Sequence, residues 1–122
     1  MVNSILILCD TSPVGKNSAV EAIRLGSGFV ALGEEIPCEI VFMGDAVYLF
    51  NKNADPTAVN MDPNDETIEM ADLSDLSVNI LEEDLKAAGL TEEDLIDYEN
   101  LRIISKEELI EKMNNTETCF RV

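Results

Sequence analysis

The sequence predicts a single α/β domain over residues 1–122, in which a five-stranded parallel sheet is covered by helices on both faces to make three layers. Short runs of apolar residues alternate along the chain with stretches in which apolar residues recur at helical spacing. The short runs are apolar on both faces, as in strands that lie between two layers of helices. A chain of 122 residues also has the size of one domain.

The first half of the chain predicts a strand, a helix and a second strand. In chain order these are a strand over Val2–Cys9, a turn-rich loop over Asp10–Gly15, a helix from Lys16 to Leu32 that stops at Gly33, and a strand over Ile36–Met43. A tight turn at Gly44 and Asp45 follows. The Asp45 carboxylate is expected to accept hydrogen bonds from the free N–H groups of the turn over Ala46–Phe50.

The second half of the chain predicts three more strands after a long excursion. Residues 51–75 are rich in Asn, Asp, Pro and Thr and hold at most a short helix near Glu66–Ala71. The elements that follow are a strand over Ser77–Leu81, a helix over Glu82–Ala88 stopped by Gly89, a helical turn capped by Thr91, a strand over Leu101–Ile104, a helix from Ser105 to about Met113 opened by a capping box with Glu108, and a strand over Thr118–Arg121.

The charge of the chain limits its partners. Lys and Arg number eight and Asp and Glu 25, for a formal charge of −17. A field of this sign repels phosphate backbones and anionic lipid headgroups, so we expect neither nucleic acid nor a membrane as a partner. The acidity either keeps the protein soluble or forms a docking face for a basic partner. No basic leader precedes the short apolar run Ile5–Leu8, so a cytoplasmic protein with reduced thiols is expected.

The residue types that commonly form catalytic centres are scarce. The chain has no histidine, and its three cysteines form no C-x-x-C pair, which excludes a zinc site and a histidine base. The carboxylate pairs Glu82-Glu83 and Glu92-Glu93 lie at helix starts, where negative charge complements the helix dipole. We therefore predict no cofactor, no metal and no independent catalytic activity.

A candidate ligand pocket lies at the carboxyl ends of the strands, where parallel sheets bind their ligands. The loop after the first strand invites comparison with the phosphate loop G-x-x-x-x-G-K-[ST]. However, Asp10 stands where the first glycine belongs and Asn17 where the metal-binding hydroxyl belongs, so nucleotide hydrolysis is not predicted. The helix N-terminus can still hold a small anion, although such a loop more commonly only turns the chain. The candidate pocket residues are Thr11, Ser12, Gly15, Lys16, Gly44 and Asp45.

The three cysteines differ in what they are expected to do. Cys9 ends the first strand and faces either the ligand crevice or the core; it is the one candidate reactive thiol, and a buried packing role is the favoured interpretation. Cys38 and Cys119 lie within strands among apolar residues. Both are expected to pack in the core.

Four segments, in order along the chain, resemble those of one family. They are the S-P-x-G start at Ser12–Gly15, the F-x-G-D-x-V turn at Phe42–Val47, the strand and helix ending in G-L at Val78–Leu90, and the final strand Cys119–Val122. In these segments the chain resembles the DsrE/DsrF family of small sulfur-relay proteins, most closely its DsrF/TusC branch. The likeness covers nearly the whole chain.

The resemblance implies a five-stranded parallel sheet, oligomers such as trimers or hexamers, and the passing of persulfide sulfur between proteins. Family members that carry sulfur do so on one cysteine near the end of the third strand. That position falls at about Leu81, and neither it nor Ile80 nor Glu82 is cysteine. The first hypothesis is therefore a relay subunit that does not carry sulfur and has a structural or docking role.

The alternative hypothesis is a stand-alone homo-oligomeric module that binds a small anionic or nucleotide-like ligand at the carboxyl ends of the strands. Both hypotheses predict an oligomer, made of this chain alone or of this chain with DsrE-like paralogues. Hydrophobic residues make up 46% of the sequence, and Val47, Tyr48, Leu49 and Phe50 follow one another directly after the turn. We expect some of this apolar surface to meet a neighbour, because one small core does not readily hide it.

Overall fold

The fold is a parallel sheet of five strands, as the sequence predicts. A computed structural model describes residues 4–10, 18–32, 37–51, 65–73, 76–96 and 98–122. Its strands are β1 (Ile5–Cys9), β2 (Cys38–Phe42), β3 (Ser77–Leu81), β4 (Leu101–Ile104) and β5 (Thr118–Arg121). They lie in the order β4-β3-β2-β1-β5, and every neighbouring pair is parallel. The last strand therefore returns past the first and forms an edge of the sheet.

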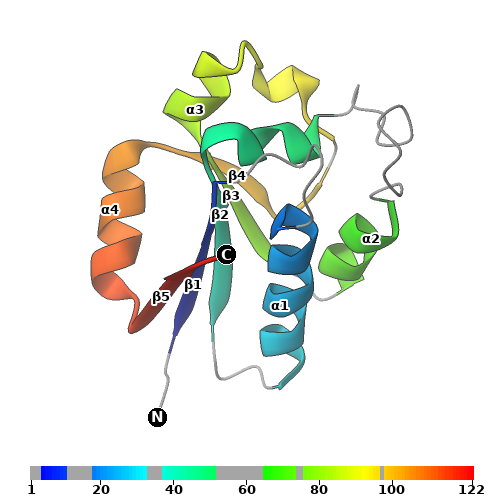
Figure 1. Ribbon diagram of the computed structural model, residues 1–122, viewed down its shortest axis with the longest axis vertical. Helices are drawn as coiled ribbons and strands as arrows, with labels where there is room; N and C mark the ends of the chain where they lie inside the picture. The colour runs from blue at the N-terminus through cyan, green and yellow to red at the C-terminus, as the bar shows by residue number, and fades with distance from the viewer. Residues whose placement is uncertain (1–3, 11–17, 33–36, 52–64, 74–75, 97) are drawn as a thin grey trace.

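Helices cover the two faces of the sheet, and further short helices lie above it, near the carboxyl ends of its strands (Figure 1). The α-helices are α1 (Ser18–Leu32), α2 (Asp65–Leu73), α3 (Glu82–Ala87) and α4 (Lys106–Asn115), and the 3₁₀ helices are η1 (Gly44–Phe50) and η3 (Glu92–Asp94). Helices α1 and α2 lie on one face, and α4 lies on the other (Figure 1). The elements η1, α3 and η3 follow strand ends or lie near them. No helix in the described ranges is both long enough and apolar enough to cross a membrane.

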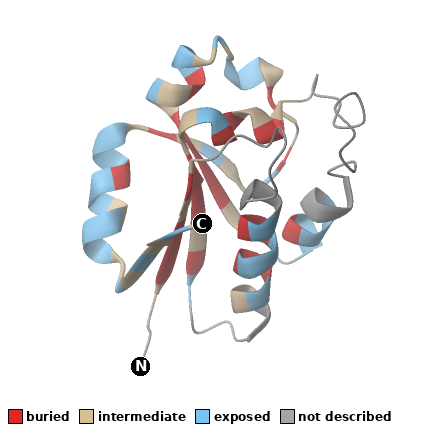
Figure 2. Cartoon of the chain, in the orientation of Figure 1, coloured by how far each residue is buried: buried red, intermediate tan, exposed pale blue. Residues whose placement is uncertain are grey.

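The strands β1 to β4 each contribute side chains to two separate hydrophobic clusters, one on each face of the sheet. Figure 2 shows how much of these strands is buried. In β1, for example, Ile5, Ile7 and Cys9 join the larger cluster, which packs under α1 and η1, whereas Leu6 joins the smaller one. The smaller cluster lies under α4 and consists of Leu6, Val41, Leu81, Ile104 and Leu109. This alternation follows from the period of two in a strand, and it requires apolar residues at successive positions because both faces are covered.

Local signals in the sequence place several helix ends correctly. Gly89 has φ +76° and directly follows α3 and its C-cap residue Ala88, so a glycine is favoured where the helix stops. The Ser105 hydroxyl accepts from the Glu108 N–H at 3.2 Å, and this closes the predicted capping box of α4. The short helix expected near Glu66–Ala71 is α2. The predicted stop at Gly33 lies outside the described residues.

The apolar residues that directly follow the second strand are buried, whereas the sequence predicted that some of them would be exposed to a neighbouring subunit. Val47, Leu49 and Phe50 are buried, with 0%, 3% and 0% of their surface exposed. Tyr48 is half-buried and its hydroxyl donates to the Ala88 carbonyl at 3.4 Å. The 3₁₀ helix η1 turns this run into the domain's own core. The oligomer stays a prediction, but this segment does not support it.

Candidate functional site

The carboxyl ends of β1, β2 and β3 lie side by side at one edge of the sheet. Cys9 pairs with Phe42, and Phe42 with Ile80, so the three strands end at nearly the same level. Gly44 and Asp45 of the predicted pocket lie at this edge. The other four residues, Thr11, Ser12, Gly15 and Lys16, lie outside the described residues, so the pocket as a whole stays a prediction.

Gly44 lies where β2 passes close to the end of β1. Its φ is +54°, a conformation that favours glycine, and a Cβ at this position would lie 3.1 Å from the carbonyl oxygen of Asp10. Its N–H donates to the Asp84 carboxylate, with 2.6 Å between the nitrogen and Oδ2. Gly44 thus joins three elements that are far apart in sequence: the end of β1, the start of η1 and the first turn of α3.

The cap of η1 is supplied by Asp84 and not by Asp45, so the sequence prediction for Asp45 is wrong. The N-cap residue of η1 is Met43, and its side chain makes no capping hydrogen bond. Asp45 is exposed, whereas Asp84 is half-buried and reaches the first N–H of η1 from α3. An anionic side chain is favourable at a helix start whichever element supplies it. No local sequence signal identifies Asp84, because 40 residues separate it from Gly44.

A second carboxylate of this edge, Asp10, also has a protein partner. Arg121 at the end of β5 donates from Nε to Asp10 Oδ1 at 2.9 Å. Apart from Arg121, which pairs with Asp10, the exposed charged side chains described here, Asp45 and Glu83, are both acidic. The described part of this edge therefore does not favour an anionic ligand. Among the described residues, no three His, Cys, Asp or Glu side chains are grouped so that they could hold a metal ion.

Leu81 is the last residue of β3. It occupies about the position at which the sequence resemblance implies a cysteine in those family members that carry sulfur. Only 7% of its surface is exposed, and it packs in the smaller cluster with side chains such as Val41 and Leu109. It is also the N-cap residue of α3, and Glu82, Glu83 and Asp84 follow it directly. Leu81 thus fills this position with a packed aliphatic side chain. Three carboxylates beside it would disfavour a thiolate here.

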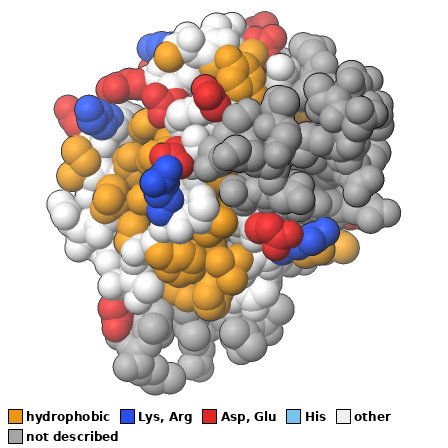
Figure 3. All heavy atoms as spheres, viewed as in Figure 1, with side chains coloured by type: hydrophobic (Ala, Val, Ile, Leu, Met, Phe, Trp, Pro, Cys, Tyr) orange, Lys and Arg blue, Asp and Glu red, His pale blue; other side chains and the backbone are white. Residues whose placement is uncertain are grey.

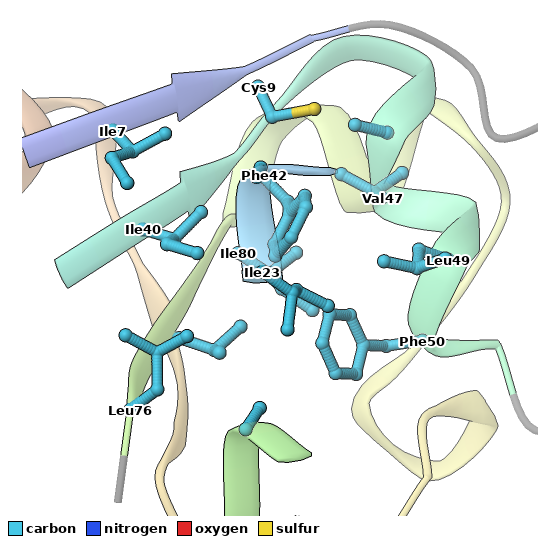
Figure 4. Close-up of a cluster of buried hydrophobic side chains, with 14 of the residues drawn as sticks. Ile7, Cys9, Ile23, Ile40, Phe42, Val47, Leu49, Phe50, Leu76 and Ile80 are labelled. Atoms are coloured by element: carbon cyan, nitrogen blue, oxygen red, sulfur yellow. The ribbon is translucent and has the colours of Figure 1, made fainter. Parts of the chain in front are cut away.

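Cys9 is buried at the end of β1. None of its surface is exposed, and it belongs to the larger cluster together with Phe42 and Val47 (Figure 4). Because the reagent of a thiol must reach the sulfur, burial argues against the reactive role considered for Cys9 and agrees with the favoured packing role.

The other two cysteines differ from each other, although the sequence predicts core packing for both. Cys38 is buried, and burial, followed by the charge of Glu39, raises the pKa of its thiol to about 11. Cys119 is exposed, so its predicted core position is wrong: its side chain lies beside Leu6 on the face that α4 alone covers among the described helices, and at the edge strand β5 that face is open to solvent. Partial desolvation raises the pKa of the Cys119 thiol as well. Neither environment favours a thiolate.

The comparisons with known proteins agree with this architecture. A sequence model described as the DsrE/DsrF-like family matches residues 3–121. The chain belongs to the DsrE/DsrF-like family. No curated protein matches the chain significantly.

Two solved structures show how widely this DsrE/DsrF-like fold is shared. The YchN protein from E. coli superposes with a TM-score of 0.81 at 18% sequence identity, over 98% of this chain and 99% of that one. The protein MTH1491 from Methanobacterium thermoautotrophicum, described as of unknown function, superposes with a TM-score of 0.72 at 11% identity over the whole of both chains. At these identities the likeness shows the fold alone.

Proposed function

We propose that this DsrE/DsrF-like chain takes part in a sulfur relay as a subunit that does not carry sulfur and that supports or docks its persulfide-carrying relatives. The observation that carries the proposal is Leu81. It stands at the end of β3, at the position where the resemblance puts the carrier cysteine, and it is packed into the cluster under α4. A side chain without sulfur in that place cannot form a persulfide.

The remaining thiols support the same conclusion. Cys9 is the one cysteine at the carboxyl ends of the described strands, and it is buried. Cys38 lies at the opposite end of its strand and has a pKa raised to about 11, so almost none of it is thiolate near neutral pH. Cys119 is exposed on β5, but its pKa is raised too. A persulfide carrier needs an accessible thiol with a lowered pKa.

The test is sulfur loading of the purified protein by a cysteine desulfurase, read by intact-mass spectrometry. We expect no stable gain of sulfur under conditions that load a cysteine-bearing relative. The variant Cys119→Ser is the control, since adventitious labelling of the exposed thiol disappears in it. Stoichiometric sulfur on the native protein that survives Cys119→Ser would overturn the proposal.

The docking role is tested separately, with a purified cysteine-bearing paralogue. We expect the two chains to form a complex in size-exclusion chromatography, and we expect persulfide transfer from the paralogue to its acceptor to be faster in that complex. A paralogue that neither binds this chain nor changes its transfer rate would contradict the docking role, even if sulfur loading fails as expected.

A further inference from the structure

Helix α2 turns one side to the core and the other side to solvent. Ala71 is fully buried in the larger cluster, and α2 packs against α1. Leu73 lies two residues further on, about 200° around the helix, and therefore on the opposite side. It is 79% exposed, more than any other large hydrophobic side chain in the described part of the chain. Met70, one turn before Leu73, is 40% exposed on the same side.

Carboxylates border these two apolar side chains. Glu69 lies one turn before Leu73 and Asp72 directly precedes it, and both are exposed. Among the described residues, neither carboxylate forms an ion pair, because the cations that do form one contact carboxylates outside α2. Figure 3 shows the same tendency on one face of the molecule, where most Lys and Arg side chains lie against Asp or Glu side chains.

The sequence around α2 is also free of compensating charge. No Lys or Arg occurs between Lys52 and Lys86, whereas this stretch carries ten acidic residues. Four of the ten belong to α2, which has nine residues. Charges on one short helix lie within about a Debye length of each other, roughly 8 Å at physiological salt, so solvent ions screen their combined field only in part.

Helix α4 is the matched counterpart of α2. Its side chains Ile110 and Met113 are 49% and 42% exposed, so α4 also turns apolar surface to solvent. The ten residues of α4, however, include three acidic and two basic residues, against four acidic and no basic residues in α2. One of the α4 cations, Lys112, pairs with Glu39 of β2. Both helices thus expose apolar side chains, and of the two only α2 combines them with uncompensated negative charge.

We propose that the outer side of α2, formed by Glu69, Met70, Asp72 and Leu73, docks a basic polypeptide segment with apolar side chains between its Lys and Arg residues. Burial of the exposed apolar side chains favours the contact, and the carboxylates attract and orient the cations. A second copy of this chain fits poorly here, because two such surfaces repel each other, as they repel nucleic acid and anionic lipid. The inference goes beyond the role in sulfur relay and does not depend on Leu81.

The experiment uses a labelled synthetic peptide of about 14 residues, with Leu on one face of its helix and Lys on the other. Fluorescence anisotropy at physiological salt measures its binding to the native protein and to two variants. We expect Leu73→Ser to raise the dissociation constant about fivefold or more and Ile110→Ser, on α4, to change it by less than about twofold. Both side chains are exposed, and circular dichroism checks that both variants fold.

A second pair of variants separates the position of the charge from its amount. Glu69→Gln combined with Asp72→Asn removes two exposed carboxylates from α2, and Glu107→Gln combined with Glu111→Gln removes two from α4. The two double variants carry the same net charge. We expect the α2 double variant to raise the dissociation constant about tenfold and the α4 double variant about twofold or less. The α2 double variant should also lose part of the salt dependence of binding.

Three results would overturn the proposal. One is that the native protein does not bind the Lys-Leu peptide at physiological salt. Another is that the α2 and α4 double variants weaken binding equally, since the peptide would then respond to net charge alone. The third is that Leu73→Ser lowers the mass of the protein itself in sedimentation velocity, because α2 would then bind a second copy. A peptide in which Glu replaces Lys is the control and should not bind.

Discussion

The two faces of the sheet are packed in different ways. On the face under α1 and α2, residues of all five strands join one continuous apolar cluster that also takes in η1. On the face under α4 the cluster has five members, and two polar side chains, Glu39 and Asn79, lie on the same face of their strands. A helix is about 10 Å wide and each strand adds about 4.8 Å, so one helix covers only about two strands.

The difference teaches that the number of covering helices decides which strand residues can be polar or exposed. Where two helices and η1 cover the sheet, the strand positions facing them are apolar or cysteine, except for Thr118 of the edge strand β5, which lies beside Ile5. Where α4 alone covers it among the described elements, Glu39 pairs with Lys112, and Cys119 reaches solvent.

The largest expected effect is a loss of stability when a buried side chain is truncated to alanine, and it is compared between one residue of each cluster. Phe42 is fully buried in the larger cluster, with its ring 5.3 Å from that of Phe50, whereas Leu109 anchors α4 on the smaller one. We expect Phe42→Ala to lower the free energy of unfolding by about 4 kcal/mol and Leu109→Ala by about 2 kcal/mol. Urea unfolding followed by circular dichroism measures both. Equal losses of stability in the two variants would contradict the difference in packing between the two faces.

The next largest expected effect is a change of folding stability with pH, and it comes from Cys38 in the larger cluster. Burial raises the pKa of Cys38 from 9.0 to about 11, so the folded chain holds this proton more tightly than the unfolded chain. The resulting stabilisation is fully present below pH 9.0 and is lost as the pH rises to about 11. Over this range we expect the native protein to lose about 2 kcal/mol more than Cys38→Ala, measured by urea unfolding at each pH. Parallel pH profiles of the two proteins would contradict the burial of the thiol.

A smaller effect tests how closely α1 packs on its face. A Cβ at Gly26 would lie 3.0 Å from Ile40 Cδ1 and 3.1 Å from Leu76 Cδ1, whereas one at Gly28, in the same helix, would meet nothing within 4 Å. Both Gly→Ala changes gain helix propensity, so the difference between them isolates the overpacking. We expect Gly26→Ala to be less stable than Gly28→Ala by about 1–2 kcal/mol in thermal unfolding. If the two variants melt alike, α1 is not held as tightly as the geometry indicates.

The smallest effect sharpens the description of the α4 face. Lys112 and Glu39 form a pair whose side chains are 21% and 34% exposed, and the Asn79 amide also donates to Glu39 Oε1 at 3.4 Å. We expect Lys112→Met to lower the free energy of unfolding by about 1 kcal/mol, because it leaves the half-buried carboxylate without its cation. Lys86→Met, which removes an exposed pair with Glu82, is the matched control and should have almost no effect. Urea unfolding of both variants decides whether the Glu39 pair holds α4 in place.

What the sequence determined by itself is local. The period of the apolar residues located the five strands, Gly89 marked the end of α3, and Ser105 with Glu108 marked the start of α4, because each signal depends on residues within a few positions of one another. The family resemblance and the absence of cysteine at Leu81 were likewise readable from the chain alone.

The tertiary structure decided what depends on strand order and on long-range contacts. Cys119 is exposed because β5 is an edge strand, and Val47, Leu49 and Phe50 are buried because η1 turns into the larger cluster. Asp84 caps η1 across 40 residues, and Arg121 meets Asp10 across 111. A contact of this kind depends on where two distant segments meet after folding, and residues adjacent in sequence carry no signal of that meeting.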